Sequence, residues 1–176
     1  LLGREPVWID TRHVADMVGG KSILITGAGG SIGSELCRQL ARFGPRKLVL
    51  FEQSEFALYT LEQWFSVHMP DIALVSLAGD VKDAARLAEV FEAYGPQVVF
   101  HAAAYKHVPL MEVGNAWQAV RNNVLGTLLV AECASRFGAE RFVLISTDKA
   151  VNPTNVMGAT KRLAEILLQG LEQCLV

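Results

Sequence analysis

The feature that most constrains this chain is a glycine-rich turn that follows an apolar run near residue 25. The segment reads Ile23-Leu24-Ile25-Thr26-Gly27-Ala28-Gly29-Gly30-Ser31-Ile32-Gly33, which predicts a buried strand, a tight turn and the start of a helix. Gly27 allows the turn, Gly30 lets backbone amides approach a pyrophosphate, and Gly33 lets the helix lie close to the sheet. The first helical residues, Ser31 and Ile32, offer unpaired N–H groups and the positive end of the helix dipole to phosphate. The segment therefore predicts a dinucleotide site.

The composition excludes several classes of protein. The chain has 176 residues, 51% of them hydrophobic, and a net charge of −2, so we expect one domain with a substantial core. Without a basic excess, binding to nucleic acid or to an anionic membrane surface is not expected. Cys37, Cys133 and Cys174 indicate a reducing compartment, with neither a disulfide framework nor metal-ligand spacing. The segment has no apolar run of membrane-spanning length and no signal-peptide pattern, so we expect it to be cytoplasmic and to make no membrane contact.

Short apolar segments alternate with longer segments of helical period from Lys21 onward. The apolar segments predict five strands buried on both faces, namely Ser22–Thr26, Lys47–Phe51, Ile72–Leu77, Gln97–His101 and Arg141–Ser146. Helices are predicted over 31–43, 54–68, 82–94, 116–137 and from 154 to the end, most of them stopped by glycine or proline. The expected fold class is α/β, a doubly wound parallel sheet of the Rossmann type over 21–176. Residues 1–20 are expected to form an arm or a short extra element.

Acidic residues follow the second and third predicted strands. Glu52, nineteen residues after Gly33, can accept hydrogen bonds from both ribose hydroxyls of an adenosine. A 2′-phosphate would meet this carboxylate with no arginine beside it, so NAD is favoured over NADP. Asp80 could accept from the exocyclic amine of adenine while Val81 covers the ring, although the two could equally form the first turn of a helix.

Small and polar residues follow the fourth predicted strand. Ala102, Ala103 and Ala104 leave room for the nicotinamide ribose and ring against the backbone. A solvated loop is the alternative for the polar residues after them, which we otherwise expect to face a substrate: Tyr105, Lys106 and His107. Asn122 and Asn123 lie in a helical segment, where asparagine is unfavourable unless its amide is bonded. One of the pair is therefore expected to bond a strand backbone, and Asn123 is also a candidate contact for the substrate.

The densest polar run follows the fifth predicted strand. Thr147, Asp148 and Lys149 make a candidate acid/base cluster, with an ordinary solvated Asp–Lys pair as the alternative. Lys161 lies four residues after Met157, on the same helix face. Its ammonium could bond the nicotinamide ribose and lower the pKa of neighbouring hydroxyls.

These segments resemble the extended short-chain dehydrogenase/reductases. More narrowly, the chain is similar to the nucleotide-sugar 4,6-dehydratases of bacterial polysaccharide and glycan biosynthesis, which act on UDP-N-acetylglucosamine. The matching residues are Leu2–Pro6, Thr26–Glu35, His101–Glu112, Asn122–Thr127 and Ser146–Arg162. Met157 stands where most relatives carry the tyrosine of a Tyr-x-x-x-Lys pair, and the long membrane-anchored branch is similar in having methionine there. The resemblance thus implies a UDP-sugar substrate and a parent protein anchored at the inner membrane, with this segment on the cytoplasmic side. It leaves a homo-oligomer open.

The methionine changes the chemistry that the resemblance implies. A thioether cannot remove a proton, so proton transfer is expected to move from Met157 to Thr147, Asp148 and Lys149. Hydride would pass from C4 of the sugar to NAD⁺ while Asp148 accepts the hydroxyl proton through Thr147. Lys149 would then remove the C5 proton, Asp148 would protonate the departing C6 hydroxyl, and hydride would return to C6.

Relatives continue past the last predicted helix into a smaller domain that holds the UDP-sugar. This chain is therefore expected to be a fragment that keeps affinity for NAD and has little or no turnover alone. Two alternatives stay open. One is a nucleotide-sugar 4-epimerase, which shares the C4 oxidation but generally keeps the tyrosine, and the other is a non-catalytic NAD-binding module.

Overall fold

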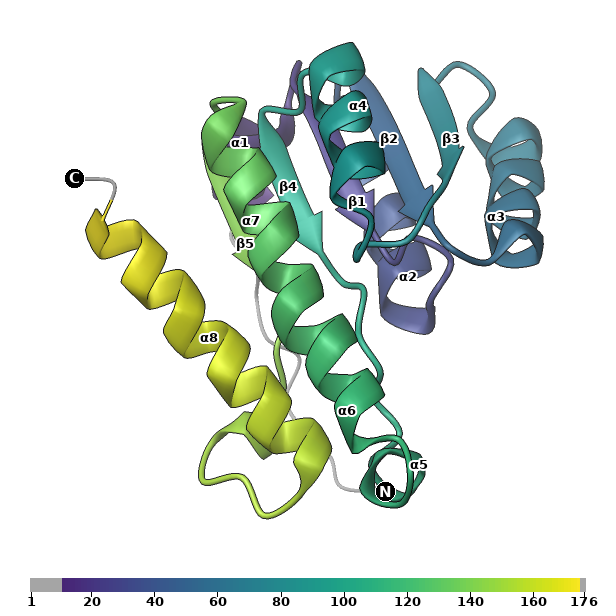
Figure 1. Cartoon of the computed structure of the whole chain (residues 1–176). Coiled ribbons are helices and arrows are strands. Elements are labelled where there is room, and N and C mark those ends of the chain that lie inside the picture. The colour runs from purple at the N-terminus through teal and green to yellow at the C-terminus, as the bar shows by residue number, and fades with distance from the viewer. Residues whose placement is uncertain (1–10, 175–176) are drawn as a thin grey trace.

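The computed structural model describes residues 11–174, and within them five parallel strands form a single sheet (Figure 1). The strands are β1 (Ser22–Thr26), β2 (Lys47–Glu52), β3 (Leu74–Ala78), β4 (Val98–His101) and β5 (Arg141–Leu144). Their order is β3-β2-β1-β4-β5, with all four neighbouring pairs parallel. β2 and β3 thus extend the sheet on one side of β1, and β4 and β5 extend it on the other side. This is the doubly wound fold that the sequence predicts.

Helices fill the connections between the strands. Those before β4 are α1 (Thr11–Val18), α2 (Ser31–Ala41), α3 (Glu55–His68) and α4 (Ala84–Tyr94). Those after β4 are α5 (Val108–Glu112), α6 (Ala116–Ala119), the π-helix η1 (Val120–Leu125), α7 (Gly126–Arg136), the 3₁₀ turn η2 (Asp148–Ala150) and α8 (Val156–Cys174).

The core lies in two layers, one on each face of the sheet. Ile23 and Ile25 of β1 pack with side chains of α1, α2 and α3. Leu24, which points the other way, packs with α4 and α7. Because successive side chains of a strand alternate between faces, a continuous apolar run is what a strand covered on both sides requires.

The edge strands depart from the predicted pattern. All residues of β1 and β4 are buried, and so is β2 after its first residue, whereas β3 and β5 are mostly half-buried. Each edge strand has one neighbouring strand among the described residues, so one side is less covered. The third strand also begins two residues later than predicted, and the fifth ends at Leu144 rather than Ser146.

Part of the predicted N-terminal arm is an ordered helix. Residues 11–18 form α1, whose Val18 is buried in the same cluster as Leu40 and Ala41 of α2. This is the short extra element that the sequence allowed. The Leu2–Pro6 segment lies outside the described residues.

A π-helix interrupts the helix that the sequence predicts over 116–137. The chain runs from α6 through η1 into α7 without leaving helical geometry, and η1 contains both Asn122 and Asn123. A π turn carries one residue more than an α turn and is frequent at functional sites. The asparagine pair is therefore accommodated by a wider turn.

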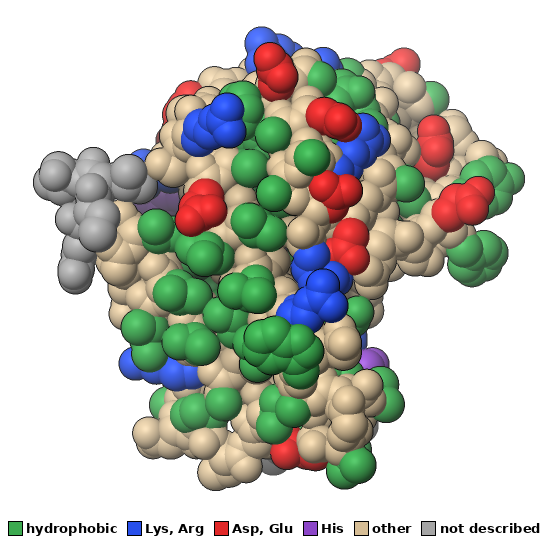
Figure 2. All heavy atoms as spheres, viewed as in Figure 1, with side chains coloured by type: hydrophobic (Ala, Val, Ile, Leu, Met, Phe, Trp, Pro, Cys, Tyr) green, Lys and Arg blue, Asp and Glu red, His purple; other side chains and the backbone are tan. Residues whose placement is uncertain are grey.

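α8 lies beside α7, and its start contacts α5 and η1 (Figure 1). Hydrophobic side chains gather over these helices (Figure 2), and Leu125, Leu163 and Ile166 are exposed there. From residue 11 to residue 174, the chain has no helix that combines the length and the apolar character needed to span a membrane.

Candidate dinucleotide and catalytic site

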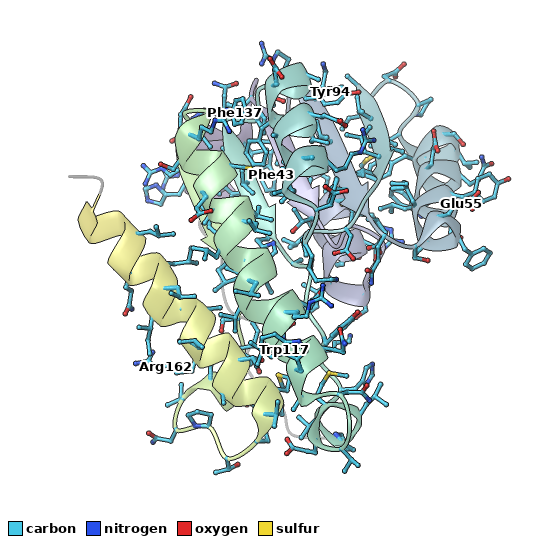
Figure 3. The ribbon with its side chains drawn as sticks, viewed as in Figure 1. Phe43, Glu55, Tyr94, Trp117, Phe137 and Arg162 are labelled. Carbon is cyan, nitrogen blue, oxygen red and sulfur yellow. The ribbon has the colours of Figure 1, made fainter. Side chains whose placement is uncertain are left out.

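Two adjoining clefts lie at the carboxyl ends of the strands. Cleft A, of about 270 Å³, is lined by the glycine turn after β1, by the region after β2 and β3, and by Ala102, Ala103 and Ala104. Cleft B, of about 280 Å³, is lined by the start of α2, the segment after β5, and Met157 and Lys161 of α8. The clefts share Gly30, Ala102, Ala104 and Tyr105, so together they form one groove. The C-terminal ends of α4 and α7, marked by Tyr94 and Phe137 in Figure 3, lie at the other end of the sheet.

The glycine turn has the geometry that the sequence predicts. Gly27 has a φ of 66°, and a Cβ there would lie 2.6 Å from the Cα of Ala103. A Cβ on Gly33 would collide with the carbonyl oxygen of Gly27, so this glycine allows close packing against the turn rather than against the sheet itself. Gly30 is the N-cap of α2, and it makes no side-chain hydrogen bond to the first backbone amides of the helix. The first amides of α2 are therefore without a side-chain cap at the junction of the two clefts.

Glu52 ends β2 and lines cleft A with a fixed orientation. One carboxylate oxygen accepts from the backbone N–H of Gly29 and the other from that of Ser54, both at 3.0 Å. The side chain is buried. Each oxygen has a second lone pair, so the carboxylate can still accept from ligand hydroxyls. Gly29 and Ser54 were not singled out from the sequence, because their contribution is a backbone N–H.

Val81 lines cleft A, whereas Asp80 lines neither cleft. One oxygen of Asp80 accepts from the backbone N–H of Lys82 at 2.9 Å and from its Nζ at 2.7 Å. Burial would raise the pKa of Asp80, but the bonds from Lys82 outweigh it and hold the pKa below its usual value. The alternative that Asp80 and Val81 form the first turn of a helix is not confirmed, because α4 begins at Ala84 with Asp83 as its N-cap. Adenine recognition by Asp80 stays a prediction.

Asn123 joins three elements in the interior. Its Oδ1 accepts from the N–H of Tyr105 at 2.8 Å, and its Nδ2 donates to the carbonyl of Tyr105 and to Oγ1 of Thr160, both at 3.0 Å. The expected bond to backbone is present, but the partner lies in the loop after β4 rather than in a strand. Asn123 has no exposed surface, which corrects the expectation that it contacts a substrate directly. It positions Tyr105 instead.

His101, at the end of β4, belongs to a buried chain of hydrogen bonds. The Thr127 hydroxyl donates to the carbonyl of Asn123 at 2.7 Å, so its oxygen accepts from His101 Nε2–H at 3.0 Å. Nδ1 then accepts from the hydroxyl of Thr26 at 2.6 Å. Burial, together with the charge of Lys161, lowers the pKa of His101 to about 3, so the imidazole is neutral.

Thr147 and Lys149 line cleft B, and Asp148 between them faces solvent. The Thr147 hydroxyl donates to Asp148 Oδ1 at 3.0 Å, and Lys149 Nζ lies 3.6 Å from the same oxygen. The Thr147 bond and the positive charge of Lys149 hold the pKa of Asp148 below its usual value. The Asp148 side chain is 90% exposed and that of Lys149 is 52% exposed, so both are accessible.

Met157 and Lys161 reach cleft B from the first turns of α8. Met157 is buried beside Met111 and Ala119. Lys161 is 4% exposed, and its Nζ donates to the carbonyl of Ile145 at 2.6 Å. Burial lowers the pKa of this ammonium to about 8. The Ile145 carbonyl gave no signal in the sequence, because any residue type supplies one.

The two other polar residues predicted to face a substrate after β4, Lys106 and His107, lie in different places in the structure. Lys106 lines cleft B, and its Nζ donates to Ser31 Oγ at 2.5 Å. His107 is exposed and lines neither cleft, because it stands at the start of α5, where its carbonyl accepts from Met111 N–H at 3.2 Å. His107 is therefore not part of the groove, and its contact with a substrate stays a prediction.

The chain is similar to polysaccharide biosynthesis proteins and to a nucleotide-sugar dehydratase. It is 49% identical over 174 residues to the capsular polysaccharide biosynthesis protein CapD of Staphylococcus aureus, covering 98% of this chain and 29% of CapD. It is 33% identical over 152 residues to an inverting UDP-N-acetylglucosamine 4,6-dehydratase of Campylobacter jejuni, covering 86% of this chain and 43% of that protein. The chain thus spans less than half the length of these relatives.

Solved structures share the fold and, again, are about twice as long. Pen from Bacillus thuringiensis has a TM-score of 0.78 at 32% identity, covering 86% of this chain and 46% of that one. A UDP-glucose 4-epimerase from Brucella ovis, solved in complex with NAD, has a TM-score of 0.71 at 26% identity, covering 85% and 47%. The family model described as polysaccharide biosynthesis protein matches residues 23–175. The chain therefore belongs to this polysaccharide biosynthesis family, whose fold it shares with nucleotide-sugar dehydratases and epimerases.

Proposed function

We propose that the groove formed by clefts A and B binds NAD, and that this chain is the cofactor-binding part of a UDP-N-acetylglucosamine 4,6-dehydratase. The observation that carries the proposal is Met157 in cleft B with Thr147 and Lys149 beside it. A site that has methionine in place of the tyrosine of a Tyr-x-x-x-Lys pair, but holds a hydroxyl and an amine next to a carboxylate, has the groups that a dehydration needs.

The residues of the groove fit a dinucleotide. The glycine turn can pack directly against the loop after β4 because Gly27 has no Cβ, which would otherwise meet Ala103. The uncapped start of α2 supplies N–H donors for a pyrophosphate, and Glu52 is held ready to accept from ribose hydroxyls. A carboxylate in that position would repel a 2′-phosphate, which supports NAD rather than NADP. When bound, NAD would supply a hydride acceptor and, in its reduced form, a hydride donor.

Asp148 serves as the first base in this proposal. Its lowered pKa keeps it ionised at neutral pH, and the Thr147 hydroxyl already donates to it. A sugar C4 hydroxyl bonded to Thr147 Oγ1 can therefore pass its proton through Thr147 to Asp148 as C4 is oxidised. Asp148 then carries the proton that the departing C6 hydroxyl requires to leave as water.

Lys149, in its neutral amine form, serves as the base at C5. Lys149 lines cleft B, and its Nζ lies 3.6 Å from Asp148 Oδ1, so one lysine and one acid can reach adjacent carbons of a sugar. The 4-ketone formed first makes the C5 hydrogen acidic enough for an amine to remove. Lys161, held by the Ile145 carbonyl, supplies the positive charge for the nicotinamide ribose.

A nucleotide-sugar 4-epimerase is the competing function, because it shares the oxidation at C4 and a solved epimerase with NAD has this fold. An epimerase removes no water, so it needs no acid for a C6 hydroxyl and no base at C5. The Asp148–Lys149 pair beside Met157 therefore favours the dehydratase.

The test is product analysis of the full-length gene product with NAD and UDP-N-acetylglucosamine. We expect a 4-keto-6-deoxy sugar that has lost its C6 hydroxyl, and a C4 epimer as sole product would refute the proposal. In deuterated buffer, a Lys149→Ala variant should lose exchange at C5. Lys47→Ala, at the start of β2 and so at the amino ends of the strands, away from the groove, should exchange normally. Normal C5 exchange in Lys149→Ala would exclude Lys149 as the base. The 176-residue chain alone should bind NAD with little or no turnover.

A further inference from the structure

The candidate acid/base cluster lies on a segment that leaves the sheet, residues 145–149. β5 ends just before Ile145, whose N–H donates to the carbonyl of His101 in β4 at 3.0 Å. Among the described residues, none forms a hydrogen bond with the backbone N–H or carbonyl of Ser146. Bonds within the sheet therefore do not fix the position of Thr147, the next residue.

α8 holds this segment through two charged side chains that lie one turn apart. Lys161 Nζ donates to the carbonyl of Ile145 at 2.6 Å. Four residues later on the same helix face, Glu165 Oε1 accepts from the hydroxyl of Ser146. Together the two bonds form what we call the α8 clamp. They hold two consecutive residues directly before Thr147.

Glu165 has the charge and the surroundings that this role requires. Its side chain is 25% exposed, and its second oxygen accepts from Arg162 Nη1 at 3.0 Å. The bond from Ser146, assisted by Arg162, outweighs the effect of burial and holds the pKa of Glu165 below its usual value, so the carboxylate is ionised at neutral pH. A hydrogen bond to an ionised carboxylate is stronger than one between neutral groups. Glu165 lines neither cleft, so any effect on the reaction passes through its partners.

The far end of the segment also packs against α8. A Cβ on Gly158 would lie 2.3 Å from the carbonyl oxygen of Lys149, so the backbones of η2 and α8 are in direct contact. Ala150, the next residue, is buried. The segment is thus held by one helix on both sides of Thr147 and Asp148.

We infer that Glu165 is a positioning residue for the dehydration, holding the Thr147 hydroxyl in place through its bond to Ser146. The inference rests on the proposed function and goes beyond it, because neither Ser146 nor Glu165 has a part in the proton transfers. A reacting group that moves by about 1 Å can lose about 100-fold in rate, so a loosened clamp should lower kcat. NAD binding should change little, because Lys161 keeps its own bond to Ile145.

The test measures kcat and KM of the full-length gene product for UDP-N-acetylglucosamine at saturating NAD. Glu165→Ala and Ser146→Ala should each lower kcat about tenfold and change KM by less than about threefold. Both substitutions remove the same bond, so the double variant should be no slower than the slower single variant. Glu165→Gln keeps an oxygen that can accept from Ser146 and should restore most of kcat. The matched control is Arg162→Ala (Arg162 is labelled in Figure 3), which removes the other partner of Glu165 and should keep the wild-type kcat.

NAD affinity, measured by titration calorimetry, checks that each variant is folded. The inference is overturned, while the proposed function stands, if the two alanine effects multiply in the double variant or if Glu165→Gln is as slow as Glu165→Ala. An equal loss of kcat in Arg162→Ala would also overturn it. Ser146→Ala removes a single oxygen atom, so a wild-type kcat in this variant overturns the inference even where Glu165→Ala does not fold. A wild-type protein that forms no 4-keto-6-deoxy sugar would overturn both the inference and the proposed function.

Discussion

The buried His101 makes a prediction about acid stability. Its ring is neutral and fixed between two hydroxyls, with Nδ1 accepting from Thr26 and Nε2 donating to Thr127. Protonation of Nδ1 would place a second hydrogen toward the Thr26 hydroxyl and a positive charge in the core. The unfolded chain, in contrast, lets the imidazole take up a proton freely.

The size of the effect follows from the two pKa values. The pKa of His101 is about 3 in the folded protein against an ordinary value of 6.5, so between these values the unfolded state binds more protons. The free energy of unfolding therefore falls as the pH is lowered through this window. Linkage gives a loss of about 2 kcal/mol between pH 7.5 and pH 5, or a Tm lower by about 4–8 °C. Ionised carboxylates add little above pH 5, because their ordinary pKa values lie near 4.

The assay is urea unfolding at pH 7.5 and pH 5, followed by tryptophan fluorescence. His101→Asn should be less stable than wild type at pH 7.5, because it loses ring packing, but its stability should change far less between the two pH values. His107→Gln removes an exposed histidine and should keep the wild-type pH dependence. If His101→Asn loses as much stability as wild type on going to pH 5, the argument from burial is refuted.

Three further predictions concern the groove. Glu52→Gln should weaken NAD binding about tenfold and reduce the preference for NAD over NADP. The substitution removes the carboxylate that accepts from the ribose hydroxyls and repels a 2′-phosphate. Unchanged calorimetric affinities for both cofactors would contradict this. Gly158→Ala places a Cβ against the Lys149 carbonyl, so the full-length gene product should lose dehydration rate by more than about tenfold while NAD affinity changes little. A normal rate in that variant would show that Lys149 tolerates the shift. NAD affinity should fall between pH 7 and pH 9 as Lys161, with its pKa of about 8, loses its proton, and Lys161→Met should bind NAD with a flat pH profile.

Local signals in the sequence were sufficient for the parts of the site that depend on local geometry. The glycine turn, Glu52 at the end of β2 and the placement of Met157 and Lys161 on one helix face all follow from spacing along the chain. The end of β5 does not follow from spacing. This strand is half-buried because it lies at the edge of the sheet, and its place in the sheet depends on which strands flank it. The partner of Asp80 could not be predicted either, because nothing in the sequence shows that Lys82 would bind its carboxylate.

The same limit applies to residues whose role is set by contacts far along the chain. Histidine is a residue type that is common in functional sites, but His107 stands at the start of α5, outside the groove. Asparagine is a residue type that can bind a substrate, but Asn123 is enclosed by Tyr105 and Thr160, which lie 18 and 37 positions away in the sequence. Such assignments follow from packing, which periodicity does not specify.

The π-helix η1 fixes the length of the chain between β4 and α7. Deleting one residue from 120–125 would convert the wide turn to an α turn and change the directions in which the side chains of this turn point. Asn122 and Asn123 would then face different neighbours, and the loop after β4 would lose its anchor. The spacing of this segment is thus a structural constraint in its own right, so gaps that surface loops tolerate should be rare between Val120 and Leu125.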